Sequence, residues 1–156
     1  MTSRTIVFSL EMCFAGITMC LADDSMMGTW KLNETKSRFH PGAPKNTIVR
    51  CEPLGDNVKF TVEGIDGDGK TTHHYEWNGK FDGKAYPVVG DPGSDMWSYE
   101  IVADRNMNFT ATKERSVVAT AEIVISADGK TRTVTVHATD SKGNKVSSTS
   151  VYDKQW

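Results

Sequence analysis

Apolar and polar residues alternate along most of the chain after Gly28, in short segments rich in β-branched and aromatic residues. A period of two places successive side chains on opposite faces of an extended strand, so these segments predict half-buried β-strands. No long segment has the periodicity of a helix. The predicted strands span residues 29–33, 46–54, 58–65, 71–80, 84–89, 96–103, 107–114, 116–126, 132–139 and 145–153.

Short separators such as "GDN", "NGKFDG", "ADGK" and "DSKGN" stand between the predicted strands. Their Gly, Asn and Asp residues tolerate the positive φ angles of tight hairpin turns, so the strands are expected to form an antiparallel meander. About ten such strands leave no open edge only by closing into a barrel or by folding into two facing sheets. We predict an all-β fold, an antiparallel up-and-down β-barrel of about 8–10 strands without substantial helix.

One connection, "ETKSRFHPGAPKN" at residues 34–46, is longer and contains two prolines and a glycine. It predicts an irregular loop across one mouth of the barrel. In that position it brings Phe39 and His40 over the opening.

The first 22 residues differ from the rest of the chain. Arg4 precedes the largely apolar run "IVFSLEMCFAGITMCLA", which ends at Ala22 before Asp23 and Asp24. A positive start, an apolar centre and a small residue before an acidic start are typical of a secretory signal peptide. We therefore predict a signal peptide at residues 1–22 and one domain at 23–156, secreted or periplasmic after cleavage. An uncleaved anchor is the alternative.

The composition of the chain limits the classes of molecule that it is expected to bind. The chain has 156 residues and a net charge of -2, so it suits one domain and offers no basic surface for nucleic acid. We expect no membrane span in the mature chain. Of the three cysteines only Cys51 follows the leader, and its place in a strand segment predicts a buried apolar side chain.

The segment "GTWKLN" at residues 28–33 resembles the Gly-x-Trp signature that opens the first strand of the calycin superfamily, which includes lipocalins and fatty-acid-binding proteins. The following "KS", aromatic, "PG" and Pro-Lys residues, and the ending "VYDKQ", are similar to small secreted bacterial lipocalin-like proteins. The resemblance covers essentially the mature chain and implies that Trp30 closes one end of the barrel. Fatty-acid-binding proteins carry an Arg-x-Tyr on the last strand. Here it reads Ser150-Val151-Tyr152, so the resemblance implies an inward tyrosine without carboxylate capture by that arginine.

Alternation also predicts what faces the interior. One face of segment 71–80 carries three aromatic side chains, and one face of 96–103 carries two with Ile101. Such walls are suited to a small hydrophobic or aromatic ligand. The predicted ligand-binding residues are His73, Tyr75, Trp77, Trp97, Tyr99 and Tyr152. The alternative is that these side chains simply fill the barrel, which would leave a structural domain.

Catalytic and metal motifs are absent from the sequence. His73 and His74 are adjacent and point to opposite faces of a strand, and "DGDGK" lacks the spacing of a calcium loop, so we predict no metal site and no cofactor. The leading hypothesis is a secreted binding protein rather than an enzyme. The alternative is a barrel isomerase, lyase or hydrolase in which an inward His73 or His137 acts as general base beside Glu63, Tyr75 or Tyr99.

Overall fold

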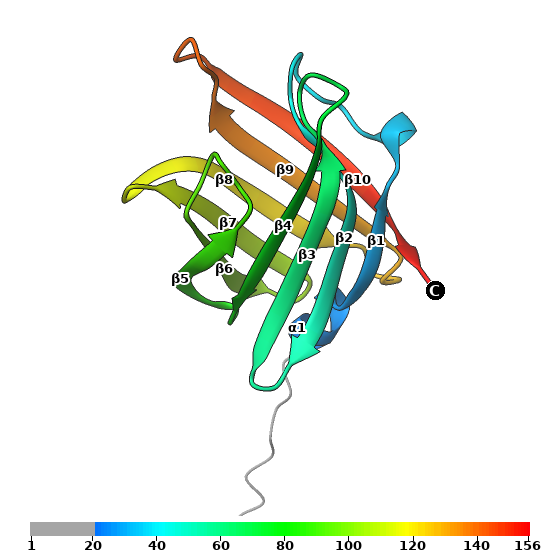
Figure 1. The fold of residues 1–156 in the computed structure, drawn as a ribbon. Helices are drawn as coiled ribbons and strands as arrows, with labels where there is room; N and C mark the ends of the chain where they lie inside the picture. Colours follow the sequence, from blue (N-terminus) through cyan, green and yellow to red (C-terminus); the bar gives the residue numbers. More distant parts are fainter. Residues whose placement is uncertain (1–20) are drawn as a thin grey trace, which may run out of the picture.

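The computed structural model describes residues 21–156, which form a closed barrel of ten antiparallel strands (Figure 1). Each strand pairs with the next in the chain, and β1 pairs with β10 to close the barrel. The strands are β1 Gly28–Leu32, β2 Lys45–Leu54, β3 Asn57–Ile65, β4 Thr72–Gly79, β5 Asp82–Val89, β6 Met96–Ala103, β7 Asn106–Lys113, β8 Ser116–Ile125, β9 Thr131–Thr139 and β10 Lys145–Gln155. The predicted all-β, up-and-down barrel is confirmed, and each predicted strand agrees within about two residues at either end.

Helical structure in the described part of the chain is limited to two short elements. The six-residue α1, Leu21–Met26, precedes β1, and the 3-10 helix η1, Glu34–Lys36, follows it. Residues 1–20 of the predicted signal peptide lie outside the described residues. Its predicted boundary at Ala22 falls within α1, and the cleavage itself stays a prediction.

The alternation of the sequence sets the two faces of each strand. In β3 the side chains of Val58, Phe60 and Val62 are buried, while Lys59 and Thr61 between them are partly exposed on the outer face. Several hairpin turns use glycine where positive φ is needed, as at Gly55 (φ 60°) before β3, whereas Arg105, Glu114 and Arg115 adopt positive φ in the turns before β7 and β8. Local sequence therefore fixes both the strand register and the side chains that enter the barrel.

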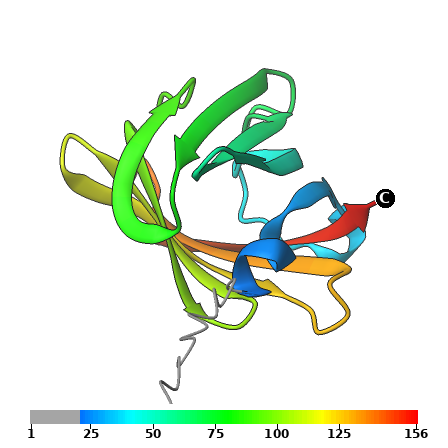
Figure 2. The same ribbon diagram turned by 90° about the horizontal axis from the view of Figure 1, so that it is seen from below.

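The lower end of the barrel is closed. α1 lies at this end beside the start of β1 (Figures 1 and 2), and Trp30 is fully buried above it. Rings also pack across the lower half: Phe60 stacks on Tyr99 at 4.7 Å between centroids, and Trp77 meets Tyr99 edge-on at 4.8 Å. This half of the interior is filled by side chains.

The connection between β1 and β2 runs over the upper end in Figure 1. We call residues 37–44 the lid. The lid is held on β10: the backbones of Arg38 and Thr149 exchange hydrogen bonds of 2.7 and 2.8 Å, and the Val151 N–H donates to the Ser37 hydroxyl at 2.9 Å. The lid therefore has a fixed position above the interior.

Candidate functional site in the barrel cavity

A cavity of about 360 Å³ lies between the lid and the filled lower half of the barrel. Aromatic rings form part of its wall, and small or β-branched side chains from β7 to β9 form much of the rest. The principal lining residues are Phe39, His40, Pro44, Asn46, Tyr75, Asp91, Ser94, Trp97, Phe109, Ala111, Val118, Ala119, Val134, Val136, Ala138, Ser148, Ser150 and Tyr152. Small side chains such as Ala111, Ala119 and Ala138 leave this space open, whereas large rings fill the lower half.

Hydrogen bonds hold the aromatic wall in place. The Trp97 indole N–H donates to the Ser94 hydroxyl at 2.7 Å, and that hydroxyl donates in turn to the Asp91 carboxylate. Trp97 also meets Tyr75 edge-on at 6.0 Å and Phe109 at 5.4 Å between ring centroids. Because the ring is anchored at its polar edge, its apolar face is fixed toward the cavity.

Tyr75 presents a neutral hydroxyl to the same cavity. Burial raises its pKa to about 12, and the negative charges of Asp91 and Asp66 add to the effect. The Tyr75 phenol in this aromatic wall is therefore protonated at neutral pH.

The lid supplies the roof. Phe39 and His40 both line the cavity, as the sequence led us to expect, and the His40 backbone N–H donates to the Ser148 hydroxyl of β10 at 3.2 Å. The Nδ1 atom of His40 lies 3.0 Å from the Pro41 carbonyl oxygen.

A smaller void of about 90 Å³ lies at the floor of the cavity, with Trp97, Val134 and Tyr152 lining both spaces. Arg132 and Tyr99 also line this void. Arg132 is 6% exposed, and the central carbon of its guanidinium lies 5.3 Å from the centroid of the Tyr152 ring. Burial raises the pKa values of Tyr99 and Tyr152, and the nearby Arg132 charge opposes the rise in both. The floor thus combines a guanidinium with two neutral phenols.

His73 points into the barrel, as predicted, but it does not line the cavity. Its side chain is 5% exposed and stacks on Tyr75 at 4.5 Å. The Nδ1–H donates to a carboxylate oxygen of Asp66 at 2.7 Å, and Nε2 lies 2.9 Å from the Asn46 side-chain oxygen. A Cβ at Gly64 would collide with this ring, so the glycine makes room for it. Because both ring nitrogens have partners, neither is directed at a bound molecule.

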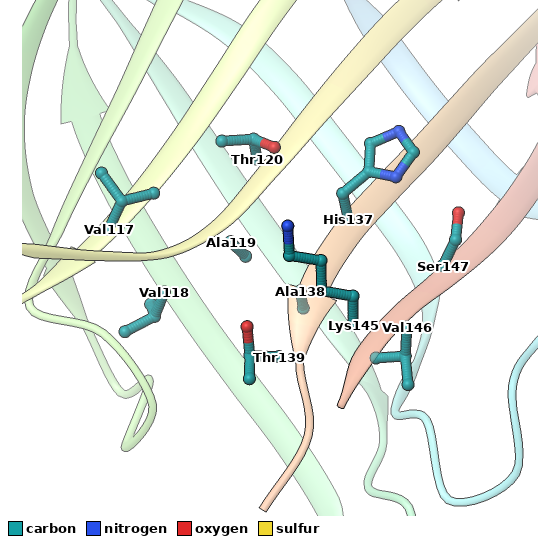
Figure 3. A pocket seen from close by; sticks show the side chains of 10 residues that line it. All are labelled: Val117, Val118, Ala119, Thr120, His137, Ala138, Thr139, Lys145, Val146 and Ser147. Carbon is teal, nitrogen blue, oxygen red and sulfur yellow. The ribbon is translucent and has the colours of Figure 1, made fainter. Parts of the chain in front are cut away.

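The expectation that His137 faces inward is wrong. On β9 the inward positions are those of Val134, Val136 and Ala138, so His137 lies on the outer face, opposite Thr120 of β8 and Ser147 of β10. Figure 3 shows its ring in a shallow outer depression that these three residues help to line.

Glu63 is also outside the barrel. It forms an ion pair with Arg50, with 2.8 Å between Nη1 and Oε1. The structure therefore does not bring His73, His137 and Glu63 together as an acid and base.

The predicted ligand-binding residues occupy different levels of the interior. Tyr75, Trp97 and Tyr152 line the cavity, and Tyr99 lines the floor void. Trp77 is buried lower, where its indole N–H donates to the Trp97 carbonyl at 3.0 Å. A role for any of these residues in binding stays a prediction.

Sequence reasoning missed Arg132 and Phe109 as lining residues. Arg132 has the same parity on its strand as Val134 and Val136, and this is the signal that could have placed it inside. Phe109 likewise has the parity of Met107 and Ala111, both buried.

The chain matches no protein-family model, and it matches no curated protein in sequence. Its ten-stranded antiparallel barrel with little helix is consistent with a calycin-like fold. Within residues 21–156 no helix is long and apolar enough to cross a membrane. The same residues contain no group of three or more His, Cys, Asp or Glu side chains that could hold a metal ion.

Proposed function

We propose that this protein is a secreted, lipocalin-like binding protein that carries a small hydrophobic or aromatic molecule in its barrel cavity. The observation that carries the proposal is the cavity of about 360 Å³ beneath the lid, with aromatic walls. Its volume falls in the range of about 300–1,000 Å³ that is typical of small-molecule sites.

The chemistry of the walls favours an apolar ligand. Trp97 and Phe109 offer ring faces and edges, and Ala111, Val134 and Val136 offer aliphatic surface. A ligand that covers these groups removes apolar area from water, which is the main source of affinity in such sites. The Tyr75 hydroxyl and the Asn46 amide are polar groups that can orient it.

Secretion is the second part of the proposal. It rests on the apolar run that ends at Ala22 before Asp23 and Asp24. A carrier outside the cytoplasm needs a water-excluding interior for an apolar cargo, so the barrel and the leader support the same role.

The proposal is tested by titrating the protein with N-phenyl-1-naphthylamine, a neutral apolar fluorophore. We expect enhanced probe emission and quenching of tryptophan emission, because Trp97 stands in the cavity wall. Ala119→Leu places extra methyl groups in the cavity and is expected to weaken binding severalfold.

Thr120→Leu is the matched control, since it adds bulk at the next residue of β8, on the outer face opposite His137. Equal binding by both variants, or no binding by the unaltered protein, would show that the cavity is not the site.

A further inference from the structure

Arg132 is a cation in an interior that otherwise has the character of an apolar ligand site. It lies on β9 directly opposite Tyr152 of β10, and its side chain lines the floor void. A buried guanidinium carries five N–H donors and a full positive charge, and removing it from water is costly unless an anion or acceptors compensate.

No carboxylate in the described part of the chain pairs with Arg132. The ion pairs among residues 21–156 involve other residues, and each has at least one partner that is substantially exposed. The Tyr152 ring at 5.3 Å offers a cation–π contact, which stabilises the charge without neutralising it. The guanidinium therefore stands at the floor with its charge unbalanced by any described acid.

Two tyrosine hydroxyls add hydrogen-bond donors beside the guanidinium. Tyr99 and Tyr152 are both almost fully buried and line the same void. Because burial raises the pKa of each phenol, both stay neutral at ordinary pH and keep O–H groups that can donate. A guanidinium beside two phenols is a donor-rich environment for an anion.

We propose that the ligand is a small apolar or aromatic monoanion whose carboxylate binds Arg132 at the barrel floor. This inference rests on the proposed binding function and specifies the ligand class and its orientation. The floor void, about 90 Å³, is much the smaller of the two spaces and is the one that Arg132 lines, so the acid group points down and the apolar part fills the cavity of about 360 Å³ above. One guanidinium matches one planar carboxylate, which it can bind through two parallel hydrogen bonds.

This site differs from the Arg-x-Tyr carboxylate site of fatty-acid-binding proteins, whose arginine the last strand of this chain lacks. The last strand carries Ser150 where an arginine would stand, and the structure supplies a cation from the adjacent strand instead. Register across β9 and β10, rather than a local motif, brings Arg132 to Tyr152.

The test compares two ligands of nearly equal shape, 2-naphthoate and 2-naphthamide, as competitors of bound N-phenyl-1-naphthylamine at neutral pH. We expect naphthoate to bind at least about tenfold tighter than naphthamide, since hydrogen bonds to charged groups are the stronger kind. Arg132→Met keeps the length and apolar stem of the side chain and is expected to abolish the difference.

Lys130→Met is the matched control, because it removes one positive charge from an exposed side chain two residues away. It should retain the preference for naphthoate. Arg132→Gln serves as a second variant if the methionine variant does not fold. The comparison of the two ligands in the unaltered protein tests the inference even if neither variant folds.

Three results would overturn the inference. Equal affinities of the two ligands in the unaltered protein would show that the floor does not select an anion. A preference that survives in the Arg132 variants would place anion recognition elsewhere. Failure of N-phenyl-1-naphthylamine to bind would remove the proposed function as well, and this distinguishes the two failures.

Discussion

The indole N–H of Trp30 donates a hydrogen bond to the backbone carbonyl of Met26 at 3.0 Å, and both residues are almost fully buried. This bond joins the end of α1 to the first strand at the closed end of the barrel. The ammonium of Lys154, on β10, lies 5.4 Å from the centroid of the Trp30 ring. Trp30 therefore holds a helix and two strands together at a level of the barrel well below the cavity.

The first prediction follows from this position. Trp30→Ala is expected to lower the free energy of unfolding by about 3–5 kcal/mol, because it removes a large buried aromatic side chain and leaves a void. Chemical denaturation measures the loss. Trp156→Ala removes the same side chain where it is 91% exposed, and should change stability little. A stable Trp30→Ala protein that has lost probe binding would instead place Trp30 in the site.

The second prediction concerns the N-terminus. If residues 1–22 are a signal peptide, exported protein begins near Asp23, and this cut leaves the Met26–Trp30 hydrogen bond intact. N-terminal sequencing of exported material provides the measurement. Exported protein that still begins with Met1 would contradict the signal peptide and favour an uncleaved anchor.

The third prediction separates the two adjacent histidines. His73→Phe keeps a ring that can stack on Tyr75 but removes the bonds to Asp66 and Asn46, so it is expected to cost about 1–3 kcal/mol. His74→Phe is the control, because His74 is exposed on the opposite face of β4. Thermal unfolding of the two variants compares them directly. Equal stability would show that the buried histidine contributes nothing through its nitrogens.

Most of the fold could be predicted from the sequence, because strands and hairpin turns depend on local patterns. The alternation through β4 placed His73, Tyr75 and Trp77 on the inner face, and the structure agrees. The same rule, applied to "TRTVTVHA" at residues 131–138, would have assigned His137 to the outside. That expectation failed because the side chain of His137 follows the parity of Thr133 and Thr135, which is the outer face of β9, whatever the chemistry of its ring.

The extent and floor of the cavity depend on contacts between distant strands. Whether a barrel is filled is decided by the summed volumes of side chains at one level, such as Trp77 with Tyr99 below and Ala111 with Ala119 above. Arg132 was missed because a charged residue at the start of a strand is normally exposed, although it shares the parity of the inward Val134 and Val136.

The fourth prediction concerns the pH dependence that the buried tyrosines give to the free energy of unfolding. Unfolded tyrosine has a pKa of about 10, whereas burial raises the pKa of Tyr75 to about 12 and also raises that of Tyr99. Above pH 10 the unfolded chain therefore loses phenolic protons that the folded chain keeps. The free energy of unfolding must fall as pH rises, while below about pH 10 these groups contribute no pH dependence.

Urea denaturation at several pH values between about 9 and 12 measures this slope. Tyr99→Phe removes one buried phenol and is expected to reduce the fall by up to about 1.4 kcal/mol per pH unit. Lysine deprotonation affects both proteins alike, so the difference between them isolates Tyr99. Tyr86→Phe is the comparison on the surface, where the hydroxyl donates to Asp82 at 2.7 Å, and it should change the slope less. Identical slopes for the Tyr99 variant and the unaltered protein would mean that this phenol ionises as readily in the folded barrel as in water, and would contradict the effect assigned to its burial at the floor.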